Sequence, residues 1–125
     1  LIRAIDFYQS IDIPVFVVSS VEVAELSKIV ENAYRYLTIA FAENVRMLAE
    51  ALGVEFWELR QAVNTKFNVD MPEARKGIGG HCLPKDVKYF LKISEHLEVP
   101  SEILKGAIEV DDKYVKYIRG KGNGG

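Results

Sequence analysis

Hydrophobic residues recur every three or four positions over a long stretch near the start of the chain. Residues 21–52 contain neither proline nor glycine, and their apolar positions follow a helical period. Ser19 and Glu22 have the spacing of a capping box. The pattern predicts a long amphipathic helix that begins near Ser19 and ends at Gly53, which can form a left-handed cap. Its apolar positions are Leu26, Ile29, Val30, Ala33, Leu37, Ala40, Phe41, Val45, Leu48 and Leu52.

A short β-branched run precedes this helix. Residues 13–18 have the composition of a strand, and a continuous apolar run of this kind is typical of a strand buried on both faces of a parallel sheet. The run has no second strand in the chain to pair with. We therefore expect it to be the remnant of a sheet that belongs to another domain.

Three shorter helices are expected after Gly53. Helical periodicity covers residues 55–63, and residues 64–76 form a polar connection. Pro84 can occupy the first turn of the next helix, which ends near Leu97, and Ser101 can cap a last helix that ends near Ile118. The glycine-rich residues 120–125 are expected to form a flexible tail. The predicted fold class is mainly α, with one short strand at its N-terminal end.

Composition and charge narrow the range of partners. The chain has 125 residues and a net charge of −2, so it has the length of one domain and lacks the basic excess of a nucleic-acid-binding protein. No apolar run reaches the ~18 residues that a membrane span needs. No signal-peptide pattern opens the chain, and its single cysteine cannot form an intrachain disulfide. We expect a cytoplasmic protein that binds neither nucleic acid nor membranes.

The single cysteine stands in a segment with unusual backbone chemistry. Residues 77–86 read Gly-Ile-Gly-Gly-His-Cys-Leu-Pro-Lys-Asp, and the glycines allow tight bends and close approach to a ligand. Near a helix N-terminus and beside Lys85 and His81, Cys82 would suit a thiol nucleophile. A lone cysteine is also commonly a small core residue, and the local residues leave the two interpretations about even. His81, Cys82 and His96 lack the paired spacing of a zinc site, so no metal is expected.

Polar residues also recur on the long helix. Lys28, Asn32 and Arg35 share a line opposite the centre of its apolar stripe. On periodicity alone, such a line most often marks a solvent-exposed face.

Three motifs together resemble a known family. They are Ala-Glu-Leu-Ser-Lys at residues 24–28 with Asn32 one turn on, Ala-Phe-Ala-Glu-Asn at residues 40–44, and residues 77–86. Their order and spacing are similar to those of the central domain of the UDP-glucose/GDP-mannose dehydrogenase family, over residues 14–118. The Gly-Gly-His-Cys form most resembles the branch that acts on UDP-N-acetylhexosamines such as UDP-N-acetylmannosamine. The Pro-Lys-Asp run is shared with the UDP-glucose branch, so the sugar stays open.

The resemblance implies a fold and a reaction. The fold is a helical central dimerisation domain like the C-terminal domain of 6-phosphogluconate dehydrogenase-like proteins. The reaction is oxidation of a UDP-sugar C6 alcohol to the uronic acid in two NAD-dependent hydride transfers. Cys82 would attack the aldehyde to form a thiohemiacetal, which becomes a thioester. Lys28 and Asn32 would stabilise the oxyanion, and Asp86 would orient or deprotonate the attacking water.

The resemblance also implies the binding residues. Gly79, Gly80 and His81 would contact the sugar nucleotide, and Lys85 would meet a phosphate of the cofactor or nucleotide. Two features depart from the family pattern. Residues 72–77 replace a Pro-Gly-Pro-Gly stretch, and Glu43 and Asn44 reverse a common Asn-Glu pair, so neither of the two receives a role.

Family members carry a nucleotide-binding domain on each side of the central one, and neither is recognisable in these residues. We expect residues 1–18 to be the end of a dinucleotide-binding domain, residues 19–119 the helical catalytic and dimerisation domain, and residues 120–125 a tail. The chain is expected to form a homodimer through its long helix and to be inactive alone, because hydride transfer needs a bound nicotinamide. The alternative hypothesis is a non-catalytic helical dimerisation or interaction module.

Overall fold

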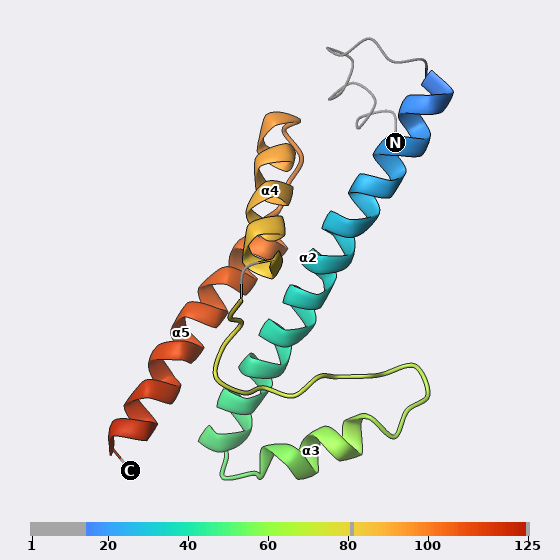
Figure 1. The fold of residues 1–125 in the computed structure, drawn as a ribbon. Coiled ribbons are helices and arrows are strands. Elements are labelled where there is room, and N and C mark those ends of the chain that lie inside the picture. Colours follow the sequence, from blue (N-terminus) through green and yellow to red (C-terminus); the bar gives the residue numbers. More distant parts are fainter. Residues whose placement is uncertain (1–14, 81, 125) are drawn as a thin grey trace.

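One long helix forms the axis of the structure, and the other helices pack against it (Figure 1). The computed structural model describes residues 15–80 and 82–124. Their helices are α2 (Val15–Ala51), α3 (Phe56–Val63), α4 (Cys82–His96) and α5 (Glu102–Gly124). These residues contain no strand, which confirms the mainly α fold class.

The C-terminal end of α2 follows the prediction. Gly53 has a φ of 75°, in the left-handed region that favours glycine. The N–H of Val54 donates to the carbonyl of Ala49 at 2.8 Å, and the N–H of Gly53 donates to that of Glu50 at 3.1 Å. These bonds satisfy carbonyls that have no partner further along the helix. The Gly53 cap is therefore confirmed.

The N-terminal end of α2 differs from the prediction. Val15 to Val18 are helical, so the strand predicted over residues 13–18 is wrong for these four; residues 13 and 14 lie outside the described residues. A lone strand leaves its backbone groups without partners, whereas a helix satisfies them within its own segment. Ser19 therefore lies inside α2 and does not begin it. The expected boundary between residues 18 and 19 falls within one continuous helix.

Small residues on α2 let the other helices approach closely. Ala33, Ala40, Ala42 and Ala49 are all at most 3% exposed. They divide between two hydrophobic clusters, one against α4 and the start of α5, the other against α3, the connection after it and the middle of α5. The first cluster is Ala33, Tyr36, Ala40, Ile78, Val87, Leu104 and Ala107. The second is Ala42, Ala49, Phe56, Met71, Ala74 and Tyr114.

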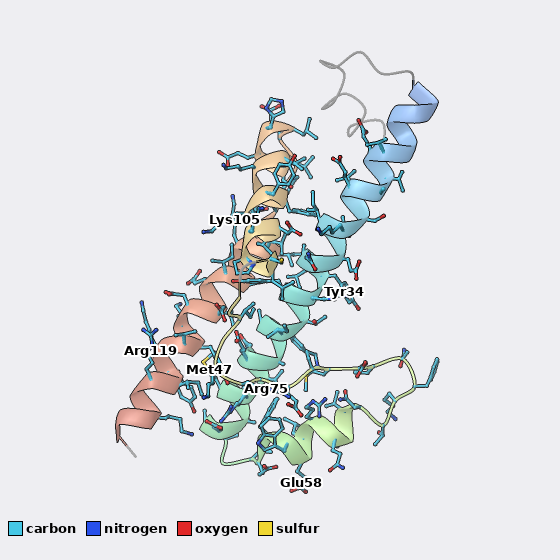
Figure 2. All side chains as sticks on the ribbon, in the orientation of Figure 1. Tyr34, Met47, Glu58, Arg75, Lys105 and Arg119 are labelled. Carbon is cyan, nitrogen blue, oxygen red and sulfur yellow. The ribbon has the colours of Figure 1, made fainter. Side chains whose placement is uncertain are left out.

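Side chains hold the connection between α3 and α4 in place. The Asn64 amide accepts from the Met71 N–H at 2.8 Å and donates to the Met71 carbonyl at 3.0 Å. Further along, the Tyr114 hydroxyl donates to the carbonyl of Arg75 at 2.5 Å and accepts from Arg46 Nη1 at 3.0 Å. Figure 2 labels Arg75 on this connection. These bonds supply partners for backbone groups that belong to no helix.

Residues 77–80, here called the glycine loop, rest against α5. The Ile78 N–H donates to Asp111 Oδ1 at 2.7 Å, and the Ile78 side chain is buried. Gly77 has a φ of 115°, and a Cβ added there would lie 2.5 Å from Val115 Cγ2. Because neither the backbone angle nor the space admits a side chain, position 77 requires glycine.

The start of α4 is as predicted, and the end of α5 extends beyond the predicted one. α4 begins at Cys82, and Pro84 lies in its first turn, where a backbone N–H has no helical partner to lose. α5 continues through Gly124, where the sequence predicts a tail without regular structure. Glu50 of α2 holds this end, because its Oε1 accepts from Lys121 Nζ at 2.7 Å and from the Tyr117 hydroxyl.

The Glu50 contacts predict a dependence of stability on pH. Hydrogen bonds from Lys121 and Tyr117 lower the pKa of Glu50 from 4.5 to about 2. Because this pKa is lower in the folded state, the contribution of Glu50 is complete above pH 4.5 and is lost as the pH falls through about 2. We expect Glu50→Gln to lower the free energy of unfolding by ~1 kcal/mol at pH 7, since the contacts lie near the surface.

Denaturant unfolding at several pH values measures this effect, with Glu95→Gln, an exposed position on α4, as the control. The difference between wild type and Glu50→Gln should shrink between pH 4.5 and 2. A difference that stays constant over that range would contradict the assignment.

The glycine loop predicts a contrast between two alanine substitutions. Gly77→Ala should lower the free energy of unfolding by about 1–3 kcal/mol, because it combines backbone strain with a clash against Val115. Gly79→Ala is the matched control, since its φ lies outside the positive region and a Cβ there meets nothing within 4 Å. Chemical denaturation compares the two, and equal costs would contradict the packing of the loop on α5.

Candidate functional site

A hydrogen bond between α2 and α4 joins two of the predicted catalytic residues. Asn32 Nδ2 donates to Asp86 Oδ2 at 2.6 Å, across 54 positions of sequence. Asn32 is 7% exposed, so the solvent-exposed face expected from periodicity is wrong at this position. The reason is that α4 covers this side of α2, and the bond to Asp86 offsets the cost of burying the Asn32 amide.

Arg35 holds the other end of the Asn32 amide. Its Nη1 donates to Asn32 Oδ1 at 3.5 Å, and its Nη2 pairs with Glu31 Oε1 at 2.5 Å. The Asn32 oxygen thus faces a cation while its nitrogen faces the Asp86 carboxylate. Sequence reasoning placed Arg35 on the same line as Asn32 but did not assign it this orienting role.

Cys82 opens α4 and is exposed to solvent. Asp86 follows four positions later, about one helical turn along the same face. Gly80, with a φ of 87°, leads into the helix, and neither Gly79 nor Gly80 has an atom within 4 Å of an added Cβ. The glycine loop is therefore open toward solvent on the side of Cys82. His81 lies outside the described residues.

Lys28 is exposed and lies one turn before Asn32 on α2. It makes no hydrogen bond or ion pair with the described part of the chain. α2 and α4 run in opposite directions (Figure 1), so Lys28 and Cys82 extend from the Asn32–Asp86 contact toward opposite ends of the interface. Of the four predicted catalytic residues, the structure brings Asn32 and Asp86 into direct contact.

Lys85 lines a hollow of about 530 Å³ on the outer side of α4. Two further lysines of α4 share it, and none of the three forms a salt bridge within residues 15–80 and 82–124. A site with several cations and no carboxylate partner suits a phosphate group. The residues around the hollow are Gly80, Pro84, Lys85, Lys88, Tyr89 and Lys92.

Sequence reasoning missed the residues that support the glycine loop. Asp111 lies 33 positions from Ile78, and no motif marks it. Glu43 is fully buried on α2 behind it. A signal for Glu43 was present, because it lies seven positions after Tyr36 and fourteen after Ile29, both on the buried side of the helix.

The described residues offer neither a metal-binding cluster nor a membrane-spanning helix. No three His, Cys, Asp or Glu side chains there are grouped so that they could bind a metal ion. None of the helices within residues 15–80 and 82–124 is both long and apolar enough to cross a membrane.

The chain is similar in sequence to several nucleotide-sugar dehydrogenases. It is 30% identical over 102 residues to an NDP-N-acetyl-D-galactosaminuronic acid dehydrogenase of Ralstonia nicotianae, which covers 82% of this chain and 23% of that protein. It is 31% identical over 102 residues to a UDP-N-acetyl-D-mannosamine dehydrogenase of Campylobacter jejuni, a match that covers 82% of this chain and 24% of that protein. A protein of the latter name from Methanocaldococcus jannaschii is 28% identical over 95 residues, with 76% and 21% coverage.

The chain thus spans less than a quarter of the length of these relatives. No solved structure matches it significantly. The profile of the UDP-glucose/GDP-mannose dehydrogenase family, central domain, matches residues 22–113, which include α3, α4, nearly all of α2 and the first half of α5. The chain therefore belongs to the UDP-glucose/GDP-mannose dehydrogenase family and contains its central domain.

Proposed function

We propose that the chain is the central catalytic domain of an NAD-dependent nucleotide-sugar dehydrogenase that oxidises the C6 alcohol of a UDP-sugar to a uronic acid. The observation that carries this proposal is the Asn32–Asp86 hydrogen bond, one helical turn from an exposed cysteine at a helix start. The names of the relatives favour a UDP-N-acetylhexosamine, such as UDP-N-acetylmannosamine, as the substrate.

The proposed roles follow from the chemistry of each side chain. The Cys82 thiolate adds to the aldehyde carbon, and the carbonyl π electrons move to the oxygen, which becomes the oxyanion of the thiohemiacetal. The Asn32 amide stabilises negative charge on that oxygen. We assign Lys28 to the same charge, although it lies one turn of α2 farther from Cys82, because its side chain is long and exposed. Asp86 orients the water that later cleaves the thioester, and its bond to Asn32 fixes the direction of its carboxylate.

The glycine loop and the lysine hollow would bind the ligands. Gly79 and Gly80 leave space beside Cys82 in which a sugar nucleotide can contact the backbone, and we assign His81 to the same subsite. Lys85 would neutralise a phosphate at the edge of the hollow. Two molecules of NAD, bound in succession, would each accept one hydride. The described residues form helices and no β-sheet of a dinucleotide-binding fold, so we expect the 125 residues alone to be inactive.

A chimeric enzyme tests the proposed nucleophile. Residues 22–113 would replace the matching segment of the Campylobacter jejuni relative, and NADH formation would be followed with UDP-N-acetylmannosamine. In an active chimera, Cys82→Ser should abolish formation of the acid, and Asp86→Asn should lower the rate by about 10²–10⁴-fold. Lys105→Gln, an exposed position on α5 within the transferred segment, is the control.

Unchanged turnover after Cys82→Ser would reject the nucleophile assignment. It would favour the alternative, a helical dimerisation or interaction module without catalysis. A chimera that stays inactive although it folds and binds NAD would count against the proposed function itself.

We also propose that α2 pairs with a second copy of the chain. Exposed apolar residues recur at positions 30, 34, 41, 48 and 52. The intervals of four or seven positions resemble those along the seam of a two-helix interface. Figure 2 shows one of them, Tyr34, near the middle of α2. An apolar hollow of about 370 Å³ adjoins this stripe, with Ile103 of α5 75% exposed at its rim. A continuous apolar stripe of this length is unusual on a monomer surface.

A charge placed on the stripe tests the dimer. We expect the wild-type chain to sediment as a dimer and Phe41→Glu to sediment as a monomer, because a buried unpaired carboxylate disfavours the interface. Phe67→Glu is the matched control, since Phe67 is equally apolar and fully exposed but lies outside α2. A monomeric wild type at micromolar concentration, or equal effects of the two variants, would contradict the proposal.

A further inference from the structure

Glu43 is an acid buried in the middle of the helical core. Its exposed fraction is 0%, and neither carboxyl oxygen has a hydrogen bond of standard geometry within residues 15–80 and 82–124. A buried carboxylate without a cation partner is strongly disfavoured, whereas the neutral acid is tolerated. Burial and the neighbouring Asp111 raise the pKa of Glu43 from 4.5 to about 8. Glu43 is therefore protonated at neutral pH.

Asp111 connects this acid to the glycine loop. Its carboxylate is the hydrogen-bonding neighbour that raises the pKa of Glu43, through a contact looser than a standard hydrogen bond. Its Oδ1 also accepts from the Ile78 N–H at 2.7 Å and lies 3.6 Å from a Cβ added at Gly77. One carboxyl of α5 thus faces both α2 and the loop that precedes Cys82.

We propose that Glu43 and Asp111 share one proton, and that this buried acid pair positions the glycine loop by holding Asp111 as the acceptor of the Ile78 N–H. The proton resides on Glu43, which points it toward the Asp111 carboxylate. Asp111 accepts that proton's hydrogen bond and keeps its Oδ1 for the Ile78 N–H of the loop backbone. Loss of the shared proton would leave two carboxylates side by side in the core.

A cation lies near the pair: Arg46, which donates to the Tyr114 hydroxyl and to the carbonyl of Ala74, both at 3.0 Å. On α2 the nearby titratable group is Tyr36. Burial raises the pKa of Tyr36 to about 12, and the charges of Asp111, Glu43 and Asp112 raise it in the same direction. On α5 Asp112 and Tyr114 are the other neighbours. Burial raises the pKa of Tyr114, Arg46 opposes this rise, and Glu43 adds to it. No group among the causes of the Glu43 shift is a cation that would stabilise a second carboxylate. Repulsion in the doubly ionised pair therefore weakens the anchor of the loop.

The direction of the pH effect follows from the higher pKa in the folded state. The contribution of Glu43 to stability is complete below pH 4.5 and is lost as the pH rises through about 8. The same ionisation should loosen residues 77–80 and so misplace Cys82. Only this last step, from loop to catalysis, rests on the proposed function. In that setting Glu43 and Asp111 are positioning residues, because neither touches the reacting atoms.

Nuclear magnetic resonance on the full chain tests the shared proton. The carboxyl carbon of Glu43 and the amide of Ile78 would be followed from pH 4 to 10. Both should change together with a midpoint well above the ordinary range for glutamate, about 4.3. The amide of Met71 is the internal control, since it donates to the neutral side chain of Asn64 at 2.8 Å and should show no such transition.

Two variants separate proton sharing from simple packing. Glu43→Gln keeps the volume and a neutral donor toward Asp111, so the Ile78 transition should disappear while the amide keeps its low-pH position. Asp111→Ala should displace the Ile78 signal at every pH, and Asp111→Asn should restore it, because an amide oxygen can replace the acceptor. In the active chimera, Glu43→Gln should remove an alkaline loss of rate that the unmodified chimera shows.

Titration of the Glu43 carboxyl below about pH 5 would overturn the proposal, and this measurement needs no variant to fold. An Ile78 transition that survives Glu43→Gln would also overturn it. If Glu43 and Ile78 titrate together as expected but the chimera shows no alkaline loss of rate, the shared proton is supported and its link to catalysis is rejected. An inactive chimera with the same titrations would count against the proposed function alone.

Discussion

The close contact of α4 and α5 with α2 is the interaction on which the rest of the structure depends. Small side chains at Ala33, Ala40, Ala42 and Ala49 allow neighbouring elements to approach the helix axis. α2 therefore serves as the shared packing surface for α3, α4 and α5. Removing this contact would also separate the residues of the candidate site, because they come from α2, from α4 and from the loop that rests on α5.

The candidate site uses that packing in two ways. Asn32 of α2 reaches Asp86 of α4, and each has a polar partner at the position where the two helices meet. Asp111 of α5 holds the glycine loop and so sets where α4 begins. The position of Cys82 thus depends on two polar contacts between elements that are far apart in sequence, while the apolar clusters determine which helices are neighbours.

Much of the helical organisation could be predicted, because it depends on local periodicity and on capping residues. The long helix, the Gly53 cap and the helix over residues 56–63 follow from such signals. The predictions were wrong where contacts with other parts of the chain, or the extension of a neighbouring helix, outweighed the local sequence signal. The β-branched Val15 to Val18 continue α2, and the glycines near the C-terminus continue α5, because contacts of Lys121 and Tyr117 with Glu50 hold that end.

The sequence by itself determined the helical class, the family motifs and the types of residue available for chemistry, since spacing and residue type are local properties. Only the tertiary structure decided that Asn32 is buried against Asp86, that Asp111 accepts from the Ile78 N–H of the glycine loop, and that the buried Glu43 neighbours Asp111. Asn32 and Asp86 lie 54 positions apart in the sequence, and Glu43 and Asp111 lie 68 positions apart. A periodic pattern shows which face of a helix is apolar. It does not show which polar group on another helix meets that face, because the crossing of the helices sets that partner.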